Sequence, residues 1–572
     1  MDFAVDLRAE PYSLDDSRIQ WVTDTLESMT VREKAGQLFC LNIVDEDAGP
    51  LLRRLEELDI VPGSCMTRAM PAEKVRENFE RLQNAFTVPL LLAGNIERGA
   101  DGVADEGTCM GTQMQIAASG DPAMAYKAGY YSALEGAALG MNWNFGPILD
   151  IDTNWHNPIT NTRVFSSDPE TVLAMAREYV RGMREAGMLV CLKHWPGDGL
   201  DERDQHMVSS TNSLSAEGWM ERYGTIYRTL IADGAETVMS AHIKLPAWSR
   251  LLRPGIADKD IMPGSLAAEL NWDLLRGKLG FNGLVVSDAT TMNGFMQAAG
   301  RSRAVPSCVA AGCDVFLFVC NLEEDFGFMM EGIRNGIITP ERLDDAVLRI
   351  LGMKAALSLP EKKGEGRLVP AKEKLRTIGS PEIITAAREC AERAVTLVKD
   401  TQKLLPLIPE KNRRILFHVL GDIGGYHDAT KNHGDYFKRK LEDEGFSVTP
   451  FDGKQADMQY LAASLASLRE RFDLILYFAN IKTSGSDTVA RISWQGPGAL
   501  NSPRYIHDIP TLFVSVDNPY HLFDVPAVKT FINGYTPSPY VMDAVIEKIL
   551  GRSDFTGVSP VDPSCGLWDA LL

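Results

Sequence analysis

The segment 193–206, KHWPGDGLDERDQH, holds one Lys, one Arg, two His and four acids, directly after the apolar run MLVCL. It is too polar for a core and too irregular for one face of a helix. Asp204 and His206 could form a dyad in which the carboxylate orients the imidazole, so that His206 serves as a general acid/base near neutral pH. The alternative is an incidental Asp and His on a solvated loop.

Asp288, in GLVVSDATTM, follows another apolar run and is the plainest candidate for a nucleophile or base. The alternative is a helix N-cap, since an Asp before a helical segment commonly caps it.

Four further side chains are candidate ligand contacts. Lys193 and His194 could bind hydroxyl or carbonyl groups, although Lys193 could also form a salt bridge at a barrel rim. His242 could contact a ligand or be a hydrogen-bonded core histidine. Arg163, in NPITNTRVFSSDPE, could clamp a polar ligand with its guanidinium group or form a surface ion pair.

The elements that must position these groups are short apolar runs that alternate with helical patterns. Near-continuous apolar strands separated by helices predict a parallel sheet covered on both faces, and eight of them predict an α/β fold of the (β/α)8 TIM-like barrel type. Active sites of such barrels lie at the C-terminal ends of the strands, where Asn95, His194, His242 and Asp288 are expected to meet. The runs are 35–43, 62–67, 89–97, 141–152, 188–195, 237–243, 283–289 and 314–321.

The composition shifts near residue 355, which predicts a barrel domain over 1–355 and a charged linker, rich in Pro and Gly, over 356–380. A smaller α/β sandwich domain with an open, mostly parallel sheet is expected over 381–572. Its predicted elements are a helix over 384–398 and strands over 414–422, 446–452, 472–480, 511–519 and 528–534.

The net charge of -19 argues against nucleic-acid or anionic-membrane partners, because both would be repelled. The chain shows neither a signal-like apolar run at its start nor a membrane-length apolar segment, so a cytoplasmic protein is expected. Cysteines in apolar runs, without metal-ligand spacing, predict buried free thiols and no metal or other cofactor; they are Cys40, Cys65, Cys191 and Cys320. The oligomeric state is left open.

With these residues in place, the whole chain resembles glycoside hydrolase family 3, in particular its β-N-acetylglucosaminidases. The similar segments are MTVREKAGQLF, NWNFGPILDI, NTRVFSSDPE, KHWPGDGLDERDQH, SAHIKLP, GLVVSDATTM, KDTQKLLPL and VSVDNPY. The loop that ends in Asp-x-His is the most specific of them, because the β-glucosidases of the family take a carboxylic acid from the C-terminal domain instead.

The resemblance implies a retaining hydrolysis of terminal β-linked N-acetylglucosamine in small glycans or peptidoglycan fragments. Asp288 would form a glycosyl-enzyme, and His206, oriented by Asp204, would protonate the leaving oxygen and later deprotonate water. Sugar hydroxyls in the first subsite would be held by Lys193, His194, Arg163 and Asn95.

The chain also departs from the family pattern. Asp198 and Trp195 stand where many members read His and Phe in K-H-F-P-G-H-G, and Asn95-Ile96-Glu97-Arg98-Gly99 replaces Asp-x-Glu-Gly-Gly. An Asn still bonds hydroxyls but brings no charge, so the exact sugar is open.

Four alternatives to this function stay open at the level of sequence. Phosphate could replace water as the acceptor, and the sugar could be another β-glycoside. A metal-dependent barrel hydrolase could use His194, His242 and Asp288 as ligands, but it needs a His-x-His pair near the first strand, and the run AGQLFCLNIVDED holds no His. A non-catalytic sugar-binding protein is disfavoured by the joint presence of Asp204, His206 and Asp288.

Overall fold

The computed structural model describes residues 4–422, 432–451, 463–481, 483, 485–486, 491–494 and 499–572. Its packing divides the chain into two compact units. The first comprises Met1–Cys109, Ala125–Asn157 and Val172–Ile383, and the second comprises Met110–Met124, Pro158–Thr171 and Ile384–Leu572.

Two segments within the predicted barrel domain therefore pack with the C-terminal unit. Hydrogen bonds fix both of them there: the Thr112 hydroxyl donates to the Tyr535 carbonyl over 3.1 Å, and the Ser166 hydroxyl donates to the Pro560 carbonyl over 2.6 Å. The predicted linker, 356–380, contains two short helices, α15 (Leu359–Gly364) and η7 (Lys372–Thr377), and belongs to the first unit.

The first unit is built on eight parallel strands, and each of the eight predicted apolar runs contains one of them. They form a five-stranded sheet in the order β10-β1-β2-β3-β4 and a three-stranded sheet in the order β5-β7-β9. Isolated parallel bridges, Trp143 to Leu189 and Val286 to Val315, join the two sheets at both seams. The strands are β1 (Phe39–Ile43), β2 (Ser64–Thr67), β3 (Leu91–Gly94), β4 (Trp143–Asn144), β5 (Cys191–Trp195), β7 (Thr237–Ser240), β9 (Leu284–Ser287) and β10 (Phe316–Leu317).

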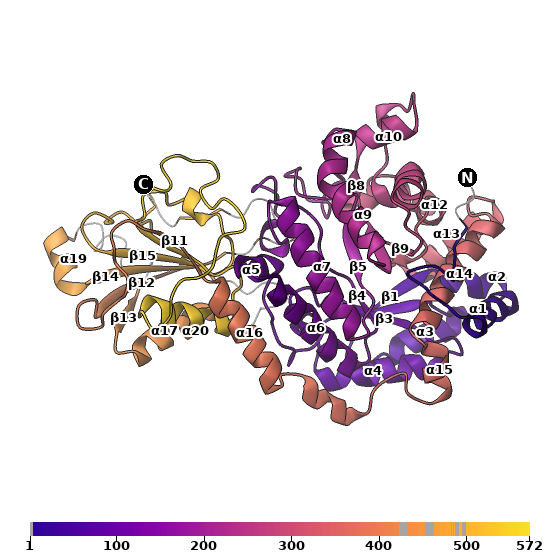
Figure 1. The fold of residues 1–572 in the computed structure, drawn as a ribbon, viewed down its shortest axis with the longest axis horizontal. Helices are drawn as coiled ribbons and strands as arrows, with labels where there is room; N and C mark the ends of the chain where they lie inside the picture. The colour runs from indigo at the N-terminus through magenta and orange to yellow at the C-terminus, as the bar shows by residue number, and fades with distance from the viewer. Residues whose placement is uncertain are drawn as a thin grey trace. The chain divides into compact units, whose positions relative to one another are not determined.

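Helices lie around these strands (Figure 1). They are α1 (Asp16–Ser28), α2 (Val31–Gln37), α3 (Gly49–Leu58), α4 (Ala72–Ala85), α6 (Pro122–Leu139), α7 (Pro169–Glu185), α8 (Ala216–Trp219), α9 (Thr225–Ala232), α10 (Pro246–Leu252), α11 (Asn293–Met296), α12 (Arg301–Ala310), α13 (Leu322–Arg334) and α14 (Pro340–Ala356). Every residue of β2, β3, β7 and β9 is buried, which is why these strands read as continuous apolar runs. The predicted TIM-like barrel is confirmed.

The second unit contains a six-stranded sheet in the order β11-β16-β15-β14-β12-β13. All neighbouring strands are parallel except β11 and β16, so the predicted open, mostly parallel sheet is confirmed. The strands are β11 (Thr396–Asp400), β12 (Arg414–Gly421), β13 (Ser447–Pro450), β14 (Leu474–Asn480), β15 (Thr511–Ser515) and β16 (Thr530–Asn533). Residue 452, the last of the predicted run 446–452, lies outside the described residues.

The predicted helix over 384–398 was too long. Helix α16 (Pro381–Ala394) ends four residues before the predicted end, and Thr396 begins β11. Two β-branched residues, Val395 and Thr396, stand at this point, and the antiparallel pairing with β16 gives the backbone a strand partner that local sequence does not reveal.

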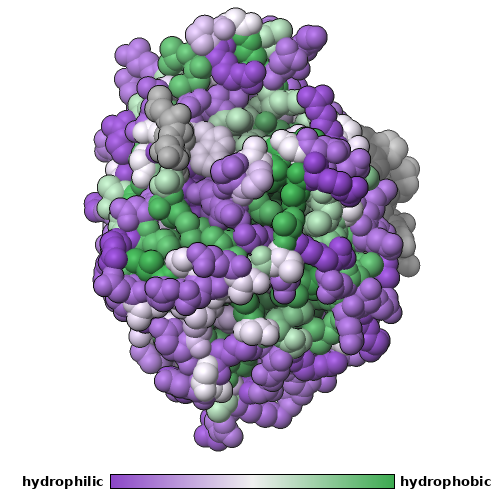
Figure 2. Space-filling view, turned by 90° about the vertical axis from the view of Figure 1, so that its right-hand side faces the viewer, coloured by the Kyte–Doolittle hydropathy of each residue, from purple (hydrophilic) through white to green (hydrophobic). Residues whose placement is uncertain are grey.

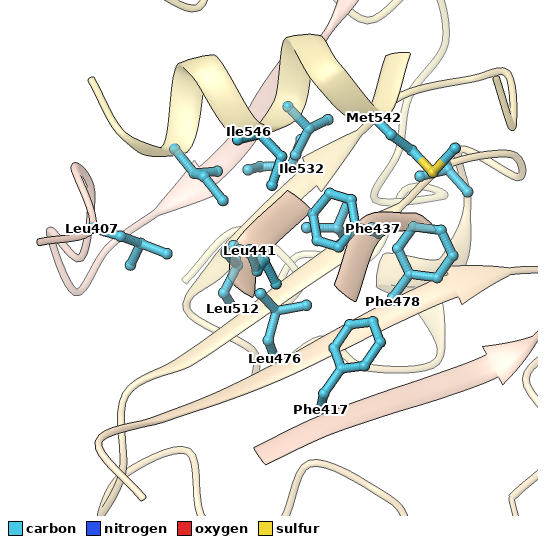
Figure 3. Packing of buried hydrophobic residues seen from close by; sticks show 14 of the residues in the cluster. Leu407, Phe417, Phe437, Leu441, Leu476, Phe478, Leu512, Ile532, Met542 and Ile546 are labelled. Carbon is cyan, nitrogen blue, oxygen red and sulfur yellow. The ribbon is translucent and has the colours of Figure 1, made fainter. Parts of the chain in front are cut away.

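Hydrophobic side chains cover both faces of this sheet. Phe417, Leu476 and Phe478 point to the face covered by α17 (His433–Asp443) and α20 (Pro539–Ile549), where they pack with Phe437 and Met542 (Figure 3). The alternate residues of the same strands, among them Leu416 and Tyr477, pack on the opposite face with Leu468 of α19 (Leu465–Arg471). Two covered faces make this unit an α/β sandwich.

The predicted burial of the four cysteines is confirmed for three of them. Cys40, Cys65 and Cys191 are buried and free, as predicted, but Cys320 is exposed. The reason is that β10 ends at Leu317, so Cys320 lies in the loop before α13.

Hydrophilic residues make up most of the face in Figure 2, with hydrophobic patches between them. Within the described ranges, no helix combines the length and apolar character needed to cross a membrane.

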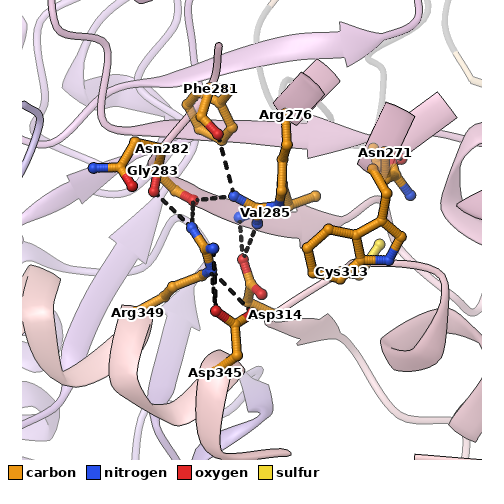
Figure 4. A network of polar contacts seen from close by, with 12 residues as sticks. Asn271, Arg276, Phe281, Asn282, Gly283, Val285, Cys313, Asp314, Asp345 and Arg349 are labelled. Carbon is orange, nitrogen blue, oxygen red and sulfur yellow. Dashed lines mark hydrogen bonds and ion pairs between the residues drawn. The ribbon is translucent and has the colours of Figure 1, made fainter. Parts of the chain in front are cut away.

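A buried ion network fixes the N-terminal ends of β9 and β10 (Figure 4). The Asp314 carboxylate accepts hydrogen bonds from Arg276 over 2.8 Å, from Arg342 over 2.7 Å and from the backbone N–H of Val285 over 2.8 Å. Asp314 is fully buried and Arg276 is 5% exposed. Because this network binds the N-terminal ends of both strands, it contributes to the stability of the barrel and is not part of the site at the C-terminal ends.

We predict that Asp314→Ala destabilises the protein by about 3–5 kcal/mol, because the buried Arg276 loses its carboxylate partner. The measurement is urea unfolding followed by tryptophan fluorescence. Asp258→Ala is the matched control, since its salt bridge with Arg250 is exposed and should contribute little. Equal unfolding midpoints for the two variants would contradict the prediction.

Candidate active site

The predicted site residues of the barrel unit lie in the C-terminal part of different strands or directly after them. Asn95 comes directly after β3, Lys193 and His194 lie in β5, His242 comes two residues after β7, and Asp288 comes directly after β9. Because all eight strands are parallel, these ends lie at the same mouth of the barrel.

Asp288 is buried at this mouth, with 8% of its surface exposed. Its backbone N–H donates to the Ser240 carbonyl over 2.8 Å, and its carboxylate accepts a hydrogen bond from the Ala289 N–H over 2.7 Å. Helix α11 begins only at Asn293, with Met292 in the cap position. Asp288 is therefore not a helix cap, and that alternative was wrong.

Charges from three imidazoles act on Asp288. Burial raises the pKa of its carboxyl group, but His194, His242 and His206 lower it and, together with the Ala289 N–H, leave it below the ordinary value. These histidines come from β5, from the residues after β7 and from the loop after β5, so tertiary structure brings them together. Asp288 is thus ionised at neutral pH, as a nucleophilic carboxylate must be.

The predicted dyad is formed. The Asp204 carboxylate accepts from His206 Nδ1 over 2.7 Å and from the His206 backbone N–H over 2.8 Å, through the same oxygen. A carboxylate only accepts, so Nδ1 holds the proton and Nε2 is the atom that can exchange one. Asp204 is 2% exposed in its side chain and His206 is 34% exposed, which leaves the imidazole open to a ligand.

His194 has a carboxylate partner of the same kind. Its Nδ1 donates to Asp150 over 2.6 Å, and the backbone N–H groups of His194 and Asp198 donate to the other Asp150 oxygen over 3.2 and 2.8 Å. This bond fixes the ring orientation and directs Nε2 away from Asp150, so that His194 can bind a hydroxyl group.

Lys193 forms the rim salt bridge that was considered as an alternative to ligand binding. Its ammonium group donates to Glu97 over 3.0 Å and to the Asn95 side-chain oxygen over 3.4 Å, and Lys193 is 2% exposed. The contact joins the ends of β3 and β5, so Asn95 and Lys193 form one polar cluster, as their strand-end positions predicted.

His242 is a hydrogen-bonded core histidine. Its Nε2 donates to the Ala289 carbonyl over 3.0 Å, and its Nδ1 lies 2.9 Å from the Ser265 hydroxyl, within hydrogen-bond distance. Burial lowers the pKa of His242. His242 therefore supports the backbone next to Asp288 and has no ring nitrogen left for a ligand.

Arg163 is not part of the barrel unit. It is the last residue of η2 (Asn161–Arg163), in the segment that packs with the second unit. Its contact with a sugar stays a prediction.

Sequence reasoning missed the role of Asp198, although its departure from the family pattern marked the position. Its carboxyl accepts from the Asn157 side chain over 2.9 Å and from the Gly199 N–H over 2.7 Å. Burial, with the nearby negative charges of Asp150 and Asp204, raises the pKa of Asp198 to about 8. The group is therefore mostly protonated at neutral pH.

This raised pKa predicts a pH-dependent stability. The folded protein keeps a proton that the unfolded chain releases, so the stability of the wild type relative to Asp198→Asn should fall by at least about 1 kcal/mol from about pH 5 to about pH 8. Urea unfolding of both proteins at the two pH values measures it. Asp201→Asn is the control: the pKa of Asp201 is lowered by Arg203 in spite of partial burial, so its effect should be the same at both pH values. A pH-independent difference for Asp198→Asn would refute the assignment.

Comparison with known proteins shows the family to which the chain belongs. Residues 30–353 match the glycosyl hydrolase family 3 N-terminal domain. A protein of Cellulomonas fimi named β-N-acetylglucosaminidase/β-glucosidase is 46% identical over 570 residues, which is 99% of this chain and 100% of that one.

Solved structures agree with the fold. A structure named β-glucoside phosphorylase BglX has a TM-score of 0.93 and 44% identity, over 99% of each chain. A family 3 β-N-acetylglucosaminidase of Paenibacillus has a TM-score of 0.78 and 24% identity, over 94% of this chain and 100% of that one. In the described residues, no group of three or more His, Cys, Asp and Glu side chains is arranged to hold a metal ion. The chain belongs to glycosyl hydrolase family 3.

Proposed function

We propose that this glycoside hydrolase removes terminal β-linked N-acetylglucosamine from small glycans or peptidoglycan fragments by a retaining mechanism, and also accepts β-glucosides. The observation that carries the proposal is the Asp204–His206 dyad at the same barrel mouth as an ionised Asp288. The name of the Cellulomonas fimi relative, β-N-acetylglucosaminidase/β-glucosidase, covers both sugars and supports this substrate class.

In the first step, Asp288 attacks the anomeric carbon, and the bond from that carbon to the leaving oxygen breaks. His206 gives its Nε2 proton to this oxygen while Asp204 stabilises the imidazolium from the Nδ1 side. In the second step, an acceptor oxygen attacks the anomeric carbon, His206 takes the acceptor's proton, and the bond to Asp288 breaks.

The polar cluster at the ends of β3 and β5 would hold the sugar. Lys193 and Asn95 are already fixed by mutual contact, and His194 is oriented by Asp150. Pre-oriented donors lose little freedom on binding, so they suit hydroxyl recognition in the first subsite.

Phosphate is the second candidate for the acceptor. Two structures named β-glucoside phosphorylase BglX, one of them bound to 2FGlc, are 44% and 45% identical to this chain with TM-scores of 0.93. The physical argument is that His206 becomes a neutral imidazole once it has given up its proton. A carboxylate in its place would be negative at that stage and would repel an incoming phosphate anion.

We predict that the wild type releases chromophore from aryl N-acetyl-β-glucosaminide and aryl β-glucoside, and that Asp288→Ala lowers kcat by about 10³-fold or more, because the nucleophile is lost. Glu202→Ala is the control, since Glu202 is an exposed acid near the dyad. Absence of turnover on both glycosides would contradict the proposed substrates.

The acceptor is tested in the same assay with and without inorganic phosphate. Water as acceptor yields the free sugar at a rate that phosphate does not change, whereas phosphorolysis yields the sugar 1-phosphate and a rate that rises with phosphate. The product, identified by NMR, decides between the two acceptors, and retention at the anomeric carbon is read from the same spectra.

A further inference from the structure

Gln205 lies between the two members of the dyad, in the loop formed by residues 196–209, here called the acid/base loop. Its side chain is buried, with 1% of the residue exposed, whereas the neighbouring His206 side chain is 34% exposed. A buried amide next to an accessible acid/base group requires an explanation, because burying an amide without bonds is unfavourable.

The buried amide joins the acid/base loop to a neighbouring strand end. Gln205 Oε1 accepts a hydrogen bond from the backbone N–H of His242 over 3.0 Å. The Gln205 backbone carbonyl accepts from the Gly294 N–H over 3.1 Å, and the His206 carbonyl accepts from the Asn293 N–H over 3.0 Å. The loop is thus bonded to the residues after β7 and to the segment that follows Asp288.

Gly294 permits this close approach. A Cβ atom at this position would lie 2.4 Å from the Gln205 carbonyl oxygen and 2.9 Å from His242 Cβ. Any side chain at 294 would therefore push the acid/base loop away from the segment that carries the nucleophile.

Asp204 alone does not fix the distance between the acid/base group and the nucleophile. It orients the His206 ring, but both residues belong to the same loop and can move together. The loop is also bonded to the segment after Asp288 by the Ser209 hydroxyl, which donates to the Gly294 carbonyl over 2.8 Å, and by the Gln297 amide, which donates to the Met207 carbonyl over 3.1 Å. The Gln205 side chain instead joins the residue directly before His206 to the backbone after β7, and a substitution can remove this bond.

We propose that Gln205 is a positioning residue, which sets the distance between His206 and Asp288 by binding the acid/base loop to the backbone of His242. The inference rests on the proposed function, because it assumes that His206 donates a proton to the leaving group.

The test compares an aryl glycoside with a poor leaving group, phenol, and one with a good leaving group, 2,4-dinitrophenol. Departure of phenol needs proton donation, whereas departure of dinitrophenolate does not. Gln205→Met keeps the length of the side chain and removes the acceptor. We expect kcat/KM to fall about 10-fold or more for the phenyl glycoside and less than about threefold for the dinitrophenyl glycoside.

Gly294→Ala is the second variant and should give the same split without changing Gln205. Gln297→Met is the matched control: Gln297 is exposed, its amide donates to the Met207 carbonyl over 3.1 Å, and both kcat/KM values should stay near those of the wild type. Thermal unfolding of each variant confirms that it is folded.

His206→Ala separates the proposed acid/base function of His206 from the positioning role of Gln205. His206→Ala is expected to lower kcat/KM selectively for the phenyl glycoside. If it does, but Gln205→Met and Gly294→Ala lower kcat/KM equally for both glycosides or for neither, Gln205 has no positioning role. If His206→Ala itself shows no leaving-group dependence, the proposed acid/base function of His206 fails, and the inference fails with it.

Discussion

An ionised carboxylate has to exist inside a buried barrel mouth, and the rest of the site is built around that constraint. Burial raises the pKa of Asp288, and electrostatic interactions with His194, His242 and His206, together with the hydrogen bond from the Ala289 N–H, bring it below the ordinary value. The imidazoles can do this because each is held by its own partner: His194 by Asp150, His206 by Asp204, and His242 by Ser265 and the Ala289 carbonyl.

These partners bring a second electrostatic problem. Asp150 and Asp204 are themselves buried acids, and Asp198 lies close enough to both for its pKa to rise to about 8. A proton on Asp198 removes one negative charge from this group of acids near neutral pH. Asn157 and the Gly199 N–H then hold the carboxyl in place through hydrogen bonds rather than through charge.

The two ends of the barrel carry different kinds of polar network. At the N-terminal ends of the strands, Asp314 is surrounded by arginines and binds β9 and β10 together, which serves stability. At the C-terminal ends, Asp288 lies among imidazoles whose rings are oriented by hydrogen bonds, which is the arrangement that the proposed proton transfer requires. Because the two networks lie at opposite ends of the strands, residues at the C-terminal mouth can be replaced without loss of the contacts that hold the barrel together.

Much of the fold follows from the sequence, because strand and helix patterns are local. Each of the eight apolar runs contains a barrel strand, and polar residues directly after them mark the mouth. The spacing of Asp204 and His206 is also local, so the dyad was predictable. Strand β11 was missed because its partner β16 lies more than a hundred residues away, and the exposure of Cys320 was missed because β10 is shorter than its apolar run.

The sequence by itself determined the barrel, the second α/β unit and the identity of the nucleophile and acid/base candidates. Only the tertiary structure decided that Asp150 holds His194, that both nitrogens of His242 have hydrogen-bond partners, that Asp198 keeps a proton and that Gln205 binds the acid/base loop to the residues after β7. The physical reason is that burial and charge depend on groups that meet across strands far apart in the chain, whereas sequence periodicity reports only what one strand or helix does alone.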